Sequence, residues 1–160
     1  MQMIDKTSKI AILGTGLMGA PMAETLLKSG YRLIAYNRTS ARAEPLVGAG
    51  AEVVSTAKLA VDRAECVILM VADATAIRDV LFPQGEPPVL KGRIVIQMGT
   101  IAPAESRSLG DEELMVWVLA INRRPCRTVK RFLSNFITNF PNEKSFSGHL
   151  HDCHVCSIPG

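Results

Sequence analysis

The 160-residue sequence is poor in cysteine and has no long apolar run. Its four cysteines are too few and too unevenly spaced for a disulfide framework, which argues against a small disulfide-rich secreted domain and agrees with a reducing compartment. No apolar stretch approaches the length that crosses a membrane, and residues 1–9 lack the apolar segment of a secretory signal. We therefore expect a soluble, cytoplasmic protein with no membrane partner.

A strong excess of one charge is also missing. Lys and Arg number 18 against 15 Asp and Glu, so the formal net charge is only +3. An excess this small does not indicate a nucleic-acid partner. Hydrophobic residues make up 48% of the chain, which argues against disorder over most of its length, and the length suits one domain with a real core.

The most informative stretch is a run of spaced glycines directly after an apolar segment. Residues 9–13 predict a buried strand, and Gly14, Gly16 and Gly19 follow it with the spacing GxGxxG. In dinucleotide-binding domains the first glycine permits a tight turn, the second lets the backbone approach a pyrophosphate, and the third lets the helix close onto the strand. A helix after Gly19 would direct its N-terminal N–H groups at the phosphates.

Strand-like and helix-like segments alternate along the rest of the first 121 residues. Short apolar runs predict buried strands at residues 31–36, 51–54, 66–71, 94–98 and, as a possible sixth strand, 114–121. Helical spacing of apolar residues predicts helices at residues 20–29, 41–47, 56–63 and 75–82. This alternation predicts the α/β class, a Rossmann-type doubly wound parallel sheet over residues 8–121. An irregular tail, with disorder as one interpretation, follows over residues 122–160.

The end of the second predicted strand bears on the choice of cofactor. About 20 residues after the glycines, an Asp or Glu binds the ribose 2′-hydroxyl of NAD, whereas an Arg accommodates the 2′-phosphate of NADP. This sequence has Asn37, Arg38 and Thr39 there, without a carboxylate that would repel a phosphate. The planar guanidinium of Arg38 suits a phosphate, so we predict NADP(H) as the cofactor. The alternative is that Arg38 is simply a solvated turn residue.

Four stretches are more specific than a general Rossmann pattern: residues 12–23 (ILGTGLMGAPMA), 36–39 (YNRT), 70–73 (MVAD) and 97–103 (QMGTIAP). Together they resemble the β-hydroxyacid dehydrogenase family. That family includes 3-hydroxyisobutyrate dehydrogenases, glyoxylate and succinic semialdehyde reductases, and the cofactor domain of 6-phosphogluconate dehydrogenase. The resemblance implies an NADP-dependent oxidoreductase that transfers a hydride between the cofactor and a small hydroxyacid, aldehyde or oxo acid.

The resemblance and the fingerprint together give a set of cofactor-binding residues: Gly14, Thr15, Gly16, Leu17, Met18, Gly19, Asn37, Arg38, Thr39, Val71, Ala72, Asp73 and Thr100. By resemblance, residues 71–73 line the adenosine side and Thr100 lies against the nicotinamide ribose. The family often has Ser-Thr where this chain has Gly99-Thr100, so the backbone N–H of Gly99 is left as a contact for a small substrate anion. Asp73 and Thr100 also have a purely structural interpretation, as N-caps of the helices that follow them.

The catalytic lysine of the resembled family has no counterpart that we can place. In the family it is supplied by an all-helical second domain that follows a Ser-Gly-Gly substrate loop. Lys130 is the nearest candidate, but Ser134 lies one turn later and no glycine precedes it. Exchange of a hydride with an alcohol also requires a general acid or base. Because we identify no residue for this role, we assign no catalytic residue and expect an incomplete catalyst. The alternative is an NADP-binding module without turnover.

Residues 122–160 differ in character from the preceding part. Five basic residues lie within residues 122–131, which suits either a nucleic-acid patch or, in a weakly basic chain, a solvated helix or loop. Three histidines and two cysteines lie within residues 149–156, where Cys153 and Cys156 have zinc-knuckle spacing without a second spaced pair. We expect neither a metal nor a nucleic acid here. The loss of family motifs after Glu113 suggests a truncation, frameshift or alternative exon.

Overall fold

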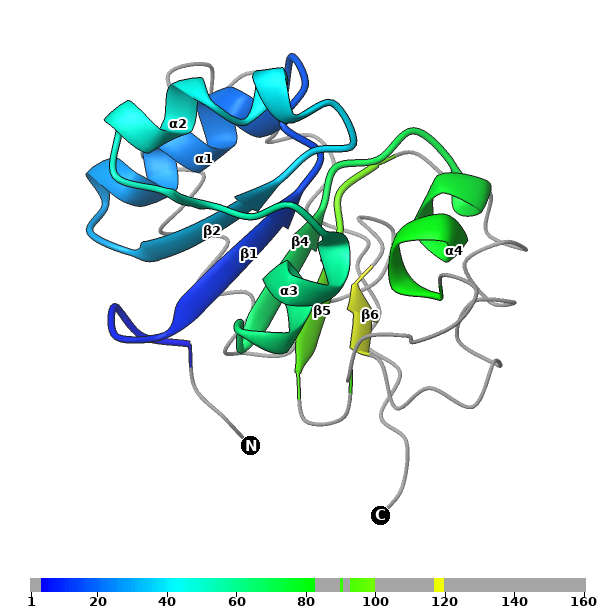
Figure 1. The fold of residues 1–160 in the computed structure, drawn as a ribbon. Coiled ribbons are helices and arrows are strands. Elements are labelled where there is room, and N and C mark those ends of the chain that lie inside the picture. Colours follow the sequence, from blue (N-terminus) through cyan, green and yellow to red (C-terminus); the bar gives the residue numbers. More distant parts are fainter. Residues whose placement is uncertain (1–3, 83–89, 91–92, 100–116, 120–160) are drawn as a thin grey trace, which may run out of the picture.

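The computed structural model describes residues 4–82, 90 and 93–99, and the backbone of residues 117–119. The elements in chain order (Figure 1) are β1 (Lys9–Leu13), α1 (Gly19–Lys28), β2 (Arg32–Tyr36), the 3₁₀ helix η1 (Ser40–Arg42), α2 (Pro45–Gly48), β3 (Glu52–Val53), α3 (Ala57–Asp62), β4 (Cys66–Leu69), α4 (Ala74–Leu81), β5 (Ile94–Gln97) and β6 (Trp117–Leu119).

These strands form one parallel sheet in the order β3-β2-β1-β4-β5-β6. The chain therefore starts in the middle of the sheet at β1, runs outward to β3, returns to pair β4 with β1, and continues to the other edge (Figure 1). This is the strand order of a doubly wound dinucleotide-binding domain, and the chain reverses its direction of travel between β1 and β4. The predicted fold class is confirmed.

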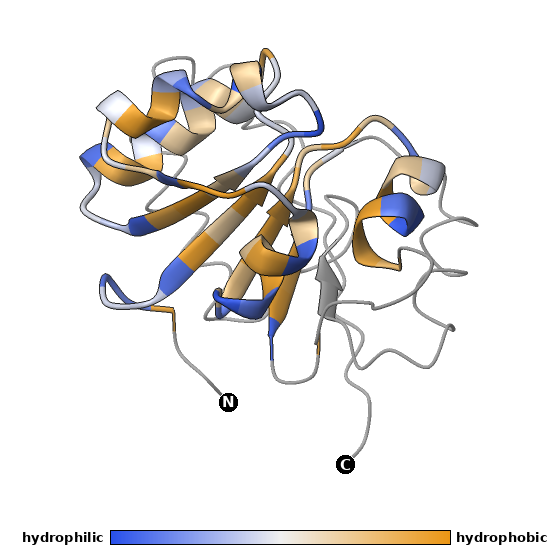
Figure 2. Ribbon diagram, in the orientation of Figure 1, coloured by the Kyte–Doolittle hydropathy of each residue, from blue (hydrophilic) through white to orange (hydrophobic). Residues whose placement is uncertain are grey.

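Helices cover both faces of the sheet, and each face has its own apolar core. Ile10 and Ile12 of β1 pack with Met22 of α1 on one face, which α1 and α2 cover. Leu13 belongs to the cluster on the other face, together with Ile77 of α4. Figure 2 shows the resulting apolar strands between their covering helices. Because successive side chains point to opposite faces, a strand covered on both sides must be apolar at nearly every position.

Most predicted elements lie within two residues of their expected bounds. The exception is the helix predicted over residues 41–47, which is wrong: the structure has η1 followed by the separate short helix α2. Pro45 is the physical reason, because proline has no N–H to continue a helix and is accepted at a first helical position, which it occupies in α2. Of the predicted sixth strand, residues 117–119 are confirmed as β6. The flanks of this predicted strand lie outside the described residues.

Cys66 illustrates how fully the central strand β4 is enclosed. Its side chain is completely buried in the core. Burial raises the pKa of the Cys66 thiol, and the neighbouring carboxylate of Glu65 raises it further. The thiol therefore stays protonated and behaves as a small apolar side chain rather than as a nucleophile.

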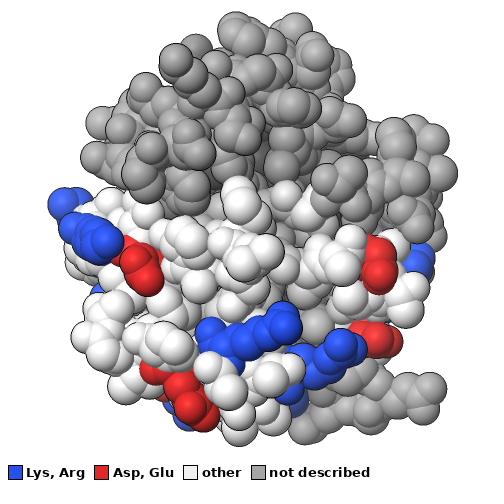
Figure 3. Space-filling view, turned by 90° about the horizontal axis from the view of Figure 1, so that it is seen from above, with Lys and Arg blue, Asp and Glu red and all other residues white. Residues whose placement is uncertain are grey.

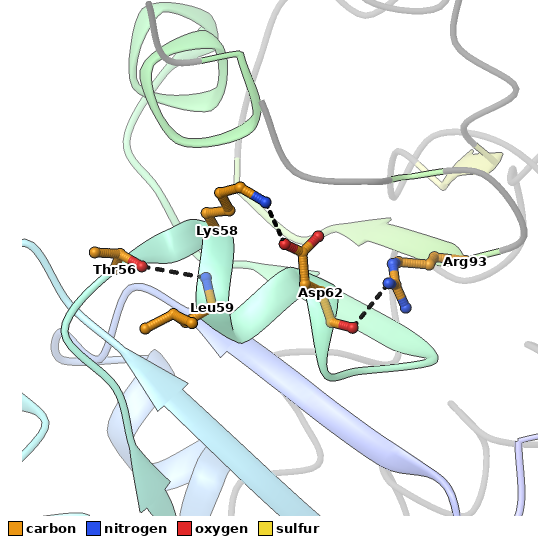
Figure 4. Close-up of polar contacts among 5 residues, drawn as sticks. All are labelled: Thr56, Lys58, Leu59, Asp62 and Arg93. Carbon is orange, nitrogen blue, oxygen red and sulfur yellow. Dashed lines mark hydrogen bonds and ion pairs between the residues drawn. The ribbon is translucent and has the colours of Figure 1, made fainter. Parts of the chain in front are cut away.

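Polar contacts fix both ends of α3 (Figure 4). At the start of the helix, Thr56 Oγ1 accepts a hydrogen bond of 3.2 Å from the backbone N–H of Leu59. At the end of the helix, Arg93 donates to the carbonyl oxygens of Asp62, at 2.9 Å, and of Ala64. A cation at the carbonyl end of a helix is stabilising, and these two bonds also join α3 to the residue that precedes β5.

We predict that Arg93→Met lowers the free energy of unfolding by about 2 kcal/mol, because the carbonyls of Asp62 and Ala64 lose a charged donor. Urea unfolding followed by circular dichroism measures the change. Lys28→Met is the matched control, since the ion pair of Lys28 with Glu24 is long, at 3.6 Å, and exposed, and its loss should cost less than about 0.5 kcal/mol. Equal effects of the two substitutions would contradict the assigned role of Arg93.

Candidate functional site

Four of the stretches singled out in the sequence lie at one edge of the sheet. Residues 14–18 follow β1, residues 37–39 follow β2, residues 71–73 follow β4, and Gly99 lies shortly after β5. Because the strands are parallel, these stretches all lie at the carboxyl ends of adjacent strands. In open parallel sheets ligands bind outside this edge, at the point where the strand order reverses.

Figure 3 views the molecule from above, the side toward which the strand arrows of Figure 1 point. Basic side chains lie close together on part of the described surface, and acidic side chains lie beside them. Among the exposed basic residues are Arg38 and Arg42, which follow β2. The described part of this surface is therefore of mixed charge.

Gly14 occupies a position in which only glycine fits. Its φ of 103° lies in the left-handed region, and a Cβ there would be 2.3 Å from the carbonyl oxygen of Met70. The N–H of Gly14 donates to the carbonyl oxygen of Tyr36 at 2.9 Å. Gly14 thus makes the predicted tight turn, held between the ends of β2 and β4.

The other two glycines of the fingerprint differ from each other in their surroundings. A Cβ on Gly19 would be 1.9 Å from the carbonyl oxygen of Gly14, so the start of α1 rests directly on the loop. A Cβ on Gly16 would meet no atom within 4 Å. Close packing at Gly19 and open space at Gly16 are what the spacing GxGxxG requires for a pyrophosphate to approach the backbone.

The N-terminus of α1 is suited to an anion. Met18 is the N-cap, no side chain caps the helix, and its first turn contains no acidic residue. Leu17 and Met18 are exposed at the loop, by 97% and 48% respectively. The partial positive charge at this end of the ten-residue helix is therefore not offset by a carboxylate of its own first turn.

The side chain of Thr15 lies inside the protein. Thr15 is 2% exposed, and its hydroxyl oxygen accepts a hydrogen bond of 3.1 Å from Nδ2 of Asn37. The Oδ1 atom of Asn37 in turn accepts from the backbone N–H of Thr39 at 2.9 Å. Asn37 thus joins the glycine loop to the turn after β2, while Arg38 remains exposed beside it. The sequence did not reveal this pairing, because the two residues are 22 positions apart.

At the end of β4, the structural interpretation of Asp73 is confirmed. Its Oδ1 atom accepts a hydrogen bond of 2.8 Å from the backbone N–H of Ala76 and so caps α4. Val71 is half-buried, and Ala72 and Asp73 are exposed at the edge of the sheet. The position of these residues is compatible with the cofactor contact expected from the family resemblance.

At the end of β5, Gln97 is a residue that the sequence analysis assigned no role. It is fully buried, and neither its Nε2 nor its Oε1 has a hydrogen-bond partner among the described residues. A Cβ on Gly99 would lie 2.8 Å from Nε2 of Gln97 and 2.5 Å from the carbonyl oxygen of Val71. The sequence did contain a signal for this residue, because a glutamine ends an otherwise apolar strand.

The predicted cofactor contact Thr100 lies outside the described residues, as do Lys130 and the Cys/His stretch of residues 149–156, to which the sequence assigned no role. Within the described ranges, no group of three or more His, Cys, Asp or Glu side chains is placed to hold a metal ion. In the same ranges, no helix is both long and apolar enough to cross a membrane.

Known proteins resemble this chain over the region that contains the segments described above. Residues 9–115 match the family model described as the NAD binding domain of 6-phosphogluconate dehydrogenase. The uncharacterized oxidoreductase YfjR of Bacillus subtilis is 42% identical over 105 residues, which cover 63% of this chain and 36% of that protein. The NAD-dependent L-serine dehydrogenase of Pseudomonas aeruginosa is 34% identical over 103 residues, or 63% and 35% of the two chains.

Among solved structures, a reductive aminase from Aspergillus terreus in complex with NADPH and ethyl levulinate has a TM-score of 0.64 and 30% sequence identity. The match covers 71% of this chain and 40% of the aminase. The present chain spans about a third of the length of the two curated relatives named above.

The surroundings of the three fingerprint glycines predict different costs for alanine. Gly14→Ala and Gly19→Ala each bring a Cβ into a backbone carbonyl, so each should lower the free energy of unfolding by about 2–4 kcal/mol. Gly16→Ala should cost no more than about 1 kcal/mol, because its Cβ meets open space. Urea unfolding of the three variants tests the order, which a similar loss at Gly16 would contradict.

Proposed function

The chain belongs to the family of the NAD binding domain of 6-phosphogluconate dehydrogenase, and from this premise we propose that it binds NADP(H) across the carboxyl edge of its sheet. The family resemblance inferred from the sequence is thereby confirmed. The observation that carries the proposal is the glycine loop, in which open space at Gly16 adjoins the uncapped N-terminus of α1.

The loop and α1 bind the pyrophosphate. The backbone around Gly16, together with the N–H groups at Leu17, Met18 and Gly19, supplies donors that need no side chain. The dipole of α1 adds a partial positive charge at the same place. Thr15 acts indirectly here, because its hydroxyl holds the loop to Asn37.

Arg38 determines the preference for NADP over NAD. Of the three relatives described above, one is NAD-dependent by name and one is bound to NADPH, so the choice between the two cofactors is argued from this chain's own residues. Asn37 places a neutral amide at the position where NAD-binding domains have a carboxylate, and its two polar atoms are engaged by Thr15 and Thr39. Arg38, exposed beside it, is left to bind the 2′-phosphate, with Thr39 as a neutral neighbour.

The family resemblance supplies the remaining contacts of the proposal. Residues 71–73 line the adenosine side of the cofactor, and Thr100 lies against the nicotinamide ribose. The backbone N–H of Gly99 contacts a small anionic substrate. These assignments and the domain boundary at residue 121 remain predictions, as does the cytoplasmic location.

A bound nicotinamide cofactor supplies hydride transfer, and the protein supplies binding and orientation. The substrate class that we propose is a small hydroxyacid or its aldehyde or oxo-acid partner. No residue of this chain is assigned as the general acid or base that such a reaction needs. We therefore propose that the 160-residue chain is the cofactor-binding part of an oxidoreductase, with a binding module that lacks turnover as the second candidate.

Substitution of Arg38 tests the proposed contact with the 2′-phosphate. Arg38→Met should raise the dissociation constant for NADPH by about tenfold or more, through loss of a charge-assisted contact, and should change that for NADH less than about threefold. Titration of nicotinamide fluorescence measures both constants. Arg32→Met is the matched control, because Arg32 is also exposed and begins β2, at the end of the strand opposite to Arg38. Wild-type affinities that are equal for NADH and NADPH would contradict the preference.

Binding of the cofactor and its turnover can be measured separately. The chain should bind NADPH saturably, while addition of glyoxylate or succinic semialdehyde causes no steady loss of nicotinamide absorbance, because no proton donor is assigned. A variant with Gly16→Ala, whose fold should persist, should bind NADPH more weakly. Sustained turnover by the wild-type chain would show that it is a complete enzyme.

A further inference from the structure

The amide of Gln97 is a buried polar group that the proposed pyrophosphate and 2′-phosphate contacts do not use. The residue is 0% exposed, and both of its side-chain polar atoms lack hydrogen-bond partners in the described part of the chain. A buried amide without a partner is destabilising, and proteins retain few of them. Its presence at the carboxyl end of β5, rather than in mid-strand, suggests a role in binding.

The amide lies close to Gly99 and to the carbonyl of Val71, two residues that follow the ends of β5 and β4. A Cβ built on Gly99 would be 2.8 Å from Nε2 of Gln97 and 2.5 Å from the carbonyl oxygen of Val71. Val71 and Gly99 both follow the last residues of their strands, which pair Leu69 with Gln97. The side chain of Gln97 therefore extends toward the edge of the sheet where ligands bind.

The strand order divides this edge into two halves. β2 lies on one side of β1, and β5 lies on the other side, beyond β4 (Figure 1). Arg38 follows β2, the glycine loop follows β1, and Gln97 ends β5. The inference that follows rests on the proposed function. A dinucleotide with its 2′-phosphate at Arg38 and its pyrophosphate at α1 extends its nicotinamide half toward β4 and β5.

We propose that Gln97 recognises the carboxamide of the nicotinamide. The Nε2 of Gln97 donates to the carboxamide oxygen, and its Oε1 accepts from the carboxamide nitrogen. Only a ligand group with both a donor and an acceptor pairs both orphan atoms at once. A substrate carboxylate, which only accepts, leaves Oε1 without a partner.

Gly99 is part of the same proposed contact. A side chain at this position would collide with Nε2 of Gln97 and with the carbonyl of Val71. The resembled family often has serine here, and this chain combines glycine with the long amide of Gln97. Glycine at position 99 therefore leaves the amide of Gln97 in its present place, which a larger residue would disturb.

The test uses the 3-acetylpyridine analogue of NADP, whose methyl ketone keeps the acceptor oxygen and lacks the amide donor. Calorimetric titration of the wild-type chain should give about fivefold tighter binding of NADP than of the analogue, the value of one hydrogen bond. Gln97→Met, which keeps the shape and removes both polar atoms, should reduce that ratio to about one. Arg32→Met is the control and should keep the wild-type ratio.

Urea unfolding of the Gln97 variant shows whether a change in cofactor binding results from loss of the fold. Without cofactor, Gln97→Met should be at least as resistant to urea as the wild type, because an unpaired buried amide is replaced by an apolar side chain. Should this variant not fold, Gln97→Leu gives the same comparison. A merely structural role of Gln97 would change stability without changing the ratio of the two cofactors.

Each outcome has a distinct meaning. A ratio that stays at the wild-type value in the Gln97 variant, or a wild-type ratio near one, overturns the inference while the proposed function stands. Equal weakening of both cofactors in the variant places Gln97 near the ribose or phosphates and also overturns it. Failure of the wild-type chain to bind NADP overturns the proposed function and this inference with it.

Discussion

The candidate site depends on two places where the backbone approaches itself so closely that only hydrogen fits between. Gly14 packs against the carbonyl of Met70 at the end of β4, and Gly19 packs against the carbonyl of Gly14. The first contact holds the loop at the junction of β1 and β4, and the second sets the start of α1 on that loop. The direction of the helix dipole, and with it the place for an anion, follows from these contacts.

Hydrogen bonds of a side-chain amide add to these close backbone contacts. The amide of Asn37 joins the hydroxyl of Thr15 to the backbone of Thr39 and so connects the ends of β1 and β2. Arg38 is carried on the turn that this link shapes. At the other end of the edge, Asp73 caps α4 and Gln97 ends β5, so polar groups are spaced along the whole line that a dinucleotide would follow.

Much of the fold follows from local sequence pattern. β1 and β4 were recognisable because strands buried on both faces are apolar throughout, and α1 because its buried residues recur at helical spacing. The pattern failed at residues 41–47, where apolar spacing was helical but Pro45 divides the segment. It also left two interpretations of Asp73, and the bond to Ala76 establishes the helix cap.

The sequence by itself determined the alternation of strands and helices and the position of the glycine loop, because these depend on residues within a few positions of one another. It also indicated the family, through four short stretches. Only the tertiary structure decided that Gln97 is buried with no hydrogen-bond partner among the described residues, that Thr15 faces Asn37, and that Met70 closes on Gly14. These contacts join strands that are neighbours in the sheet and distant in the chain, so strand order and register create them, and no local pattern encodes them.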